Sequence, residues 1–222
     1  MKTNETLQRD VQDALKWEPL LHAAEIGVTA EEGVVTLTGT VDNYARKIQA
    51  ENAARKVEGV KVVVEKIQVE VSHWFTKSDN ELATDILNAF KLNSEIPKDQ
   101  VKIKVEKGWV TLEGEFPWNY QRRAVEKTTS DVAGVKGVTL NIVIKPEVVA
   151  SIEKEELERA LQRNSSIDED DDIHVKVSGT KITLTGTVSS LHGKEAASRE
   201  AWKAPGVWTV DNELVVDYEF TD

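Results

Sequence analysis

The chain has 222 residues, of which 40% are hydrophobic and 30% charged, and its formal net charge at pH 7 is −11. This composition is typical of a globular protein, and the length allows one domain or two to three small ones. The chain contains no cysteine, which excludes disulfide scaffolds, thiolate catalysis and cysteine-ligated metal sites. A strongly acidic chain also argues against nucleic acid as a partner, because phosphate binding needs clustered lysine and arginine.

The sequence predicts neither a membrane span nor an export signal. No apolar run approaches the roughly 18 residues that a transmembrane helix needs. The N-terminal stretch MKTNETLQRDV lacks the apolar core of a secretory signal. We therefore expect a cytoplasmic protein, or a periplasmic one if a leader has been removed.

Three related segments organise the chain. A glycine-bounded TLxG-like element recurs at 33–41, 108–116 and 179–188. Each is followed by a helix-like stretch and a Gly-Val pair, at 59–60, 134–135 and 206–207. The glycine of the TLxG element and the glycine of the Gly-Val pair are 20 residues apart in all three segments. This constant spacing predicts three tandem domains, which we place at 1–72, 73–147 and 148–222.

Each predicted domain begins with an amphipathic helix. Its apolar residues are spaced by four: Leu7, Val11 and Leu15; Leu82, Ile86 and Phe90; Leu157 and Leu161. Such spacing forms one buried stripe. Ser78 and Glu81 add a capping box to the second of these helices.

A strand, a glycine-containing turn and the TLxG strand come next. The first strands are expected at 26–29, 101–105 and 173–177. A second helix then presents small residues to the sheet: Ala50, Ala54 and Val57; Val125, Thr129 and Val132; Ala197, Ala201 and Ala204. The last strands are expected at 60–71, 138–144 and 207–216. The order αββαβ predicts an α+β fold, in which each domain has a small mixed three-stranded sheet with both helices on one face.

The repeated pattern resembles the BON domain, named for bacterial osmotically inducible and nodulation proteins. The first copy is carried by Gly33, Val35, Leu37, Gly39, Val41, Gly59 and Val60. The second is carried by Gly108, Val110, Leu112, Gly114, Gly134 and Val135. The third is carried by Gly179, Ile182, Leu184, Gly186, Val188, Gly206 and Val207, with Gly179 displaced by one position.

The resemblance implies an αββαβ fold, no enzymatic activity, and association with phospholipid membranes or envelope partners, often in osmotic or envelope stress. The motif residues are structural glycines and core aliphatics, so the resemblance supplies no ligand-binding residue.

Catalysis finds little support in the residues themselves. The histidines (His22, His73, His174 and His192) show no metal-ligand spacing, and there is no glycine-rich phosphate loop. We therefore expect no catalytic residue, metal or cofactor. The acidic run 168–172 departs from a calcium loop, because Ile173 and Gly179 stand where an EF-hand needs Gly and Glu. We interpret it as a solvated loop.

The charge of each predicted domain points to the middle one as a binding module. The three net charges are −3, 0 and −8, so only the middle domain can approach an anionic surface without strong repulsion. Its candidate patch contains Trp118, Tyr120, Arg122, Arg123 and Lys127. Tyrosine and tryptophan favour membrane interfaces, and each cation near anionic lipid contributes about 1 kcal/mol.

Two interpretations of these side chains stay open. Trp118 and Tyr120 either contact lipid or pack against a neighbouring domain, and Trp74 and Phe75, at the first domain joint, face the same choice. The first hypothesis is association with an anionic phospholipid surface or an envelope partner. The alternative is a soluble protein-interaction or oligomerising scaffold, which includes a homo-oligomer.

Overall fold

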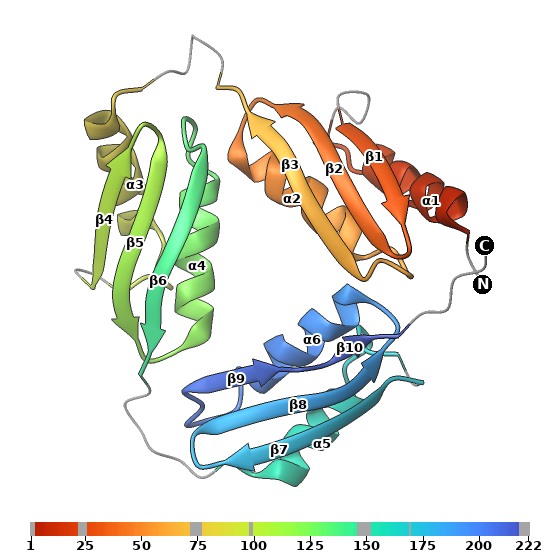
Figure 1. Ribbon diagram of the computed structural model, residues 1–222. Coiled ribbons are helices and arrows are strands. Elements are labelled where there is room, and N and C mark those ends of the chain that lie inside the picture. The colour runs from red at the N-terminus through yellow and green to blue at the C-terminus, as the bar shows by residue number, and fades with distance from the viewer. Residues whose placement is uncertain are drawn as a thin grey trace. The chain divides into compact units, whose positions relative to one another are not determined.

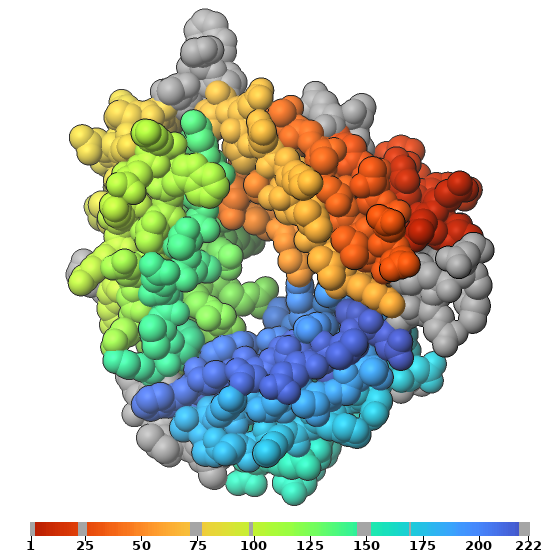
Figure 2. Space-filling model, in the orientation of Figure 1, coloured from red at the N-terminus to blue at the C-terminus, as the bar shows by residue number. Residues whose placement is uncertain are grey.

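The computed structural model describes residues 3–21, 26–71, 77–97, 100–145, 152–168 and 170–217. Within these ranges the chain forms three α-β-β-α-β repeats, each with two helices on one face of a small mixed sheet (Figure 1). The predicted α+β fold is therefore confirmed. Among the described residues of each repeat, no helix covers the other face of its sheet, and Figure 2 shows the sheet of repeat two from that side.

The elements follow one another in the same order in each repeat. Repeat one has α1 (Asn4–Lys16), β1 (Ile26–Glu31), β2 (Val34–Val41), α2 (Tyr44–Arg55) and β3 (Val62–Val69). Repeat two has α3 (Asp79–Leu92), β4 (Val101–Glu106), β5 (Trp109–Phe116), α4 (Asn119–Ser130) and β6 (Gly137–Ile144). Repeat three has α5 (Lys154–Gln162), β7 (Asp172–Ser178), β8 (Lys181–Val188), α6 (Leu191–Ala201), β9 (Thr209–Asn212) and β10 (Val215–Val216).

The TLxG strand is the central strand of each sheet. In repeat two, β5 pairs antiparallel with β4 and parallel with β6. In repeat three, β8 pairs antiparallel with β7 and parallel with β9 and β10. A parallel pair needs a crossover, which the second helix of the repeat supplies.

The last strand of repeat three departs from the prediction of one strand over 207–216, because it is divided into β9 and β10. Both pieces keep one register with β8, where Lys181 faces Thr209 and Thr187 faces Val215. Side chains take over the backbone groups at the break. Lys194 donates to the Leu214 carbonyl (2.5 Å), and the Asn212 amide accepts from the Leu214 N–H (3.2 Å).

The first helices bury the apolar stripes that the sequence predicts. Leu7, Val11 and Leu15 are at most 1% exposed in α1, and Leu82, Ile86 and Phe90 are buried in α3. Helix α5 has only 9 residues, compared with 13 in α1 and 14 in α3. It therefore buries only Leu157 and Leu161.

Docking of each hairpin tip explains the constant glycine spacing. The Gly33 carbonyl accepts from the Lys61 N–H (2.8 Å), and the Gly108 carbonyl accepts from the Lys136 N–H (2.9 Å). The Thr180 carbonyl accepts from Trp208 in the same way (2.9 Å). A glycine with left-handed backbone lies two residues before each donor, with φ of 91°, 105° and 80° at Gly59, Gly134 and Gly206. The hairpin thus meets the end of the second helix at a fixed chain distance.

The predicted capping box at the start of α3 is present and offers a first test. Ser78 accepts from the Glu81 N–H (3.3 Å), and the Glu81 carboxylate accepts from the Ser78 N–H (2.9 Å). We expect Ser78→Ala to lower the free energy of unfolding by about 1 kcal/mol, as is usual for loss of an N-cap. Hydrogen exchange at the first turn of α3 should rise, whereas Ser94→Ala, at an exposed turn residue, should change neither.

The stabilisation by this box should also depend on pH. Hydrogen bonds from the Ser78 side chain and backbone lower the pKa of the Glu81 carboxyl. A carboxyl with a lowered folded pKa stabilises above its unfolded pKa, and the effect disappears as pH falls through the folded value. The difference between wild type and Ser78→Ala should therefore shrink in acid. A constant difference from pH 7 to pH 3 would contradict this account.

Candidate binding surface on the middle repeat

The start of α4 is positioned by the strand that precedes it. Strand β5 ends at Phe116, whose side chain is fully buried, and Pro117 follows. Trp118 is the N-cap of α4 in an extended conformation (φ −135°, ψ 140°), and its N–H donates to the Gln121 side chain (3.2 Å). The indole of Trp118 remains 42% exposed at the entrance to the helix.

Helical geometry then brings three predicted residues onto one side of α4. Tyr120, Arg123 and Lys127 are separated by three and four residues, and positions at that spacing are neighbours on a helix surface. All three are exposed, and Tyr120 is 54% exposed. We call Trp118, Tyr120, Arg123 and Lys127 the α4 surface.

Arg122 lies apart from the α4 surface. It is spaced by three and seven residues from Val125 and Thr129, which are both fully buried, and it is itself half-buried. Burial lowers the pKa of the Arg122 guanidinium, Glu126 opposes that shift, and Arg123 adds to it. An arginine stays protonated despite such a shift, so Arg122 contributes charge from the side of the helix that faces the repeat's own core.

The two cations of the α4 surface are available to a partner. Among the residues that the structure describes, neither Arg123 nor Lys127 forms an ion pair. Tyr120 shares one side of α4 with these two cations, and Trp118 is exposed at the N-terminus of the helix, a combination that suits a surface that is both apolar and anionic. Trp74 and Phe75, the other predicted site residues, lie outside the described residues.

Sequence reasoning missed another exposed tryptophan on the middle repeat. Trp109 lies on the helix-free face of the sheet and is 56% exposed. Its indole covers Gly137, its partner in the parallel pair, where a Cβ would lie 2.2 Å from the ring. The register of a bulky aromatic opposite a glycine was the available signal. Trp17 and Leu92, which are 85% and 89% exposed, occupy matching places at the ends of α1 and α3.

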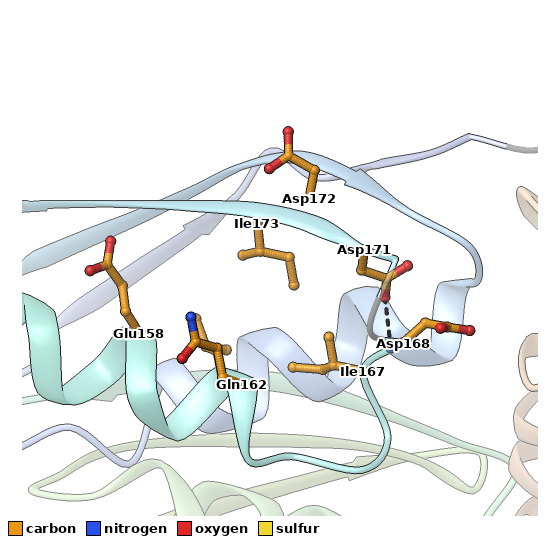
Figure 3. Close-up of a pocket in the computed structure, with 8 residues that line it drawn as sticks. Glu158, Gln162, Ile167, Asp168, Asp171, Asp172 and Ile173 are labelled. Carbon is orange, nitrogen blue, oxygen red and sulfur yellow. Dashed lines mark hydrogen bonds between the residues drawn. The ribbon is translucent and has the colours of Figure 1, made fainter.

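In the acidic run of repeat three, the Asp171 side chain binds backbone N–H groups of its own repeat. The Asp171 carboxylate accepts from the N–H of Asp168 (3.1 Å, dashed in Figure 3) and from that of Ser189 (2.7 Å). No group of three or more acidic, histidine or cysteine side chains in the described part of the chain is arranged to hold a metal ion. These contacts account for Asp171 as a structural residue.

The histidines do not form a site within the described ranges. His174 is exposed and lies 3.4 Å from the Asp172 carboxylate. His192 belongs to α6, and burial lowers the pKa of its imidazole. His22 and His73 lie outside the described residues. No helix of the described chain is long and apolar enough to cross a membrane.

The repeats define a class of protein. The chain belongs to the BON domain family, which matches residues 3–71, 78–146 and 151–218. It is similar to the osmotically-inducible protein Y of Escherichia coli (strain K12), with 29% identity over 139 residues that cover 61% of this chain and 69% of that protein.

Two solved structures of the Chlamydia trachomatis type III secretion protein CdsD also align with the chain. One is 14% identical and covers 94% of this chain and 91% of its own, and the other is 16% identical and covers 96% and 98%. Both have a TM-score of 0.25.

Proposed function

We propose that this protein is a non-enzymatic BON protein that associates with anionic phospholipid surfaces through the α4 surface of its middle repeat. The observation that carries the proposal is the pair of exposed rings, Trp118 and Tyr120, on a helix that also presents the unpaired Arg123 and Lys127. By its relation to a protein named osmotically inducible, we place this association in osmotic or envelope stress.

The energetics require the rings as well as the charges. Two cations near an anionic leaflet contribute about 2 kcal/mol in total. Millimolar affinity needs about 4 kcal/mol, so charge alone is insufficient. Burying the Trp118 indole would add roughly 1.5–3 kcal/mol. Binding is therefore expected to be weak for one molecule and to strengthen where several bind together.

Co-flotation with phosphatidylglycerol liposomes tests the proposal. We expect the wild-type chain to float at low salt and less at physiological salt, because salt screens exposed charges. The double variant Trp118→Ala/Arg123→Glu should remain at the bottom of the gradient. Lys102→Glu changes another exposed cation, on β4, and is the matched control, which should still float. Absence of wild-type flotation at low salt would exclude the membrane proposal for this chain.

A second candidate function is a protein-interaction or oligomerising scaffold. The observation that favours it is the exposure to water of three large apolar side chains, Trp17, Leu92 and Trp109. Sedimentation equilibrium of the wild type in the absence of lipid separates the two. A molar mass that rises with concentration would support self-association, and a constant monomer mass would contradict it.

A further inference from the structure

The first helix of repeat three ends about one turn early. Leu15 in α1 and Phe90 in α3 occupy the third place in the buried stripe of their repeats, and α5 has ended before that place is reached. The turn that follows is nevertheless the same in all three repeats. The Ile167 N–H donates to the Asn164 carbonyl (3.0 Å), as Leu21 does to Glu18 (3.0 Å) and Ile96 to Asn93 (3.3 Å).

The missing turn leaves a hollow of about 570 Å³ between α5, the acidic loop and β7. Its apolar lining is Leu161, Ile167 and Ile173, and Figure 3 shows both isoleucines pointing into the space between helix and strand. Both are only partly buried and pack against the core of repeat three. The residues that match Ile167 in the sister repeats, Leu21 and Ile96, are 8% and 5% exposed. The hollow is thus an unfilled extension of the core.

The rim of the hollow is acidic. Glu158 and Asp168 stand at its two ends (Figure 3), and the described residues that line it include no lysine or arginine. Asp171 is occupied by two backbone N–H groups, and Glu158 has an exposed contact with Lys154 (3.3 Å) that is worth little in water. Repeat three as a whole has 8 basic and 16 acidic residues. This field repels anions and attracts cations.

We propose that this hollow is a docking site for a basic peptide segment of another protein. One bulky apolar side chain of the segment would fill the place that Leu15 and Phe90 fill in the sister repeats, while flanking lysines or arginines face Glu158 and Asp168. An apolar floor supplies affinity and the charged rim selects the partner and its orientation. The site belongs to a different repeat from the α4 surface, so either proposal can fail alone.

Anisotropy of a dye-labelled Lys-Lys-Phe-Lys-Lys peptide tests the docking site with the full chain. We expect this peptide to bind at least about fivefold tighter than Lys-Lys-Ala-Lys-Lys, because the phenylalanine ring is buried and alanine is not. Affinity for both should fall with salt. With isoleucine methyls labelled for NMR, Ile167 and Ile173 should shift on titration. Equal affinity for the two peptides, or unshifted methyls at both isoleucines, would overturn the proposal.

Variants distinguish the contribution of the hollow to peptide binding from that of the overall charge of the chain. Ile173→Phe places a ring in the hollow and should abolish the preference for phenylalanine over alanine. Asp168→Lys should weaken binding of the phenylalanine peptide about tenfold, whereas Asp217→Lys makes the same charge change at an exposed position outside the lining and should weaken it less than twofold. Equal losses of peptide affinity in the two lysine variants would mean that only the net charge of the chain matters, and this would contradict a defined site. Circular dichroism of each variant confirms that it is folded.

Discussion

Replacing Gly186 by alanine should cost about 3 kcal/mol or more in the free energy of unfolding of repeat three, as expected when strain and overlap coincide. Gly186 has φ +116°, a conformation that side-chain-bearing residues rarely adopt. A Cβ there would lie 2.0 Å from the Asp172 carbonyl oxygen at the start of β7. Because that oxygen belongs to the backbone of a paired strand, the sheet must shift to admit a methyl group. Urea unfolding and hydrogen exchange across β7 and β8 measure the loss.

Gly179→Ala is the matched control for this prediction. Gly179 lies at the tip of the same hairpin with φ +61°, but no heavy atom lies within 4 Å of the position of an added Cβ. Its substitution carries the left-handed backbone cost alone, about 1–2 kcal/mol. Equal losses at the two positions would show that backbone conformation, and not the close approach to Asp172, explains the conserved spacing of the motif glycines within the three repeats.

The fold was predictable because its determinants are local and repeated. The stripe Leu82, Ile86 and Phe90 identifies a helix by period, and the Ser78 capping box fixes where it starts. The spacing from Gly114 to Gly134 can be counted in the sequence. Its cause, the hydrogen bond from the Lys136 N–H to the Gly108 carbonyl, is seen only in the structure. Periodicity reveals which residues share a face and leaves open what that face contacts.

The short helix of repeat three was harder to predict. From Leu82 to Leu157 the repeats are offset by 75 residues, and from Asn93 to Asn164 by 71, so the shortening lies between Leu161 and Asn164. Gln162 and Arg163 are ordinary helix residues and give no local sign of a missing turn. The position of the missing turn follows only from aligning Asn164 with Asn93. The side chains of both accept a hydrogen bond from the N–H of the residue two positions later (3.0 and 2.9 Å).

The sequence singled out the candidate residues around the start of α4, but it did not show which of them share a side of the helix. Five neighbouring residues suggested one patch, but a helix distributes consecutive residues around its axis. The buried stripe of Val125 and Thr129 already implied that Arg122, three residues before Val125, lies beside them and that Arg123 does not. Trp109 was not singled out from the sequence, although its alternation with Val110, which is buried, places its side chain on the outward face of β5.

Replacing Phe116 by alanine should destabilise the middle repeat by about 3–5 kcal/mol, the usual cost of truncating a buried phenylalanine. The ring is 0% exposed at the end of β5, directly before the turn that positions Trp118. A core of this size rarely supplies more than about 3–5 kcal/mol, so the variant should leave the middle repeat largely unfolded and should also abolish liposome flotation. Glu113→Ala, at an exposed position of the same strand, should do neither.

How far the destabilisation from Phe116→Ala spreads along the chain tests the predicted domains 1–72, 73–147 and 148–222. If each repeat is an independent folding unit, fast hydrogen exchange will be confined to the middle repeat, because a lost core contact destabilises the cooperative unit that contains it. Exchange that rises equally in α1 and α5 would show that the three repeats unfold together, and the boundaries would then be structural repeats within one domain. A loss below about 1 kcal/mol would contradict the assignment of Phe116 to a well-packed core.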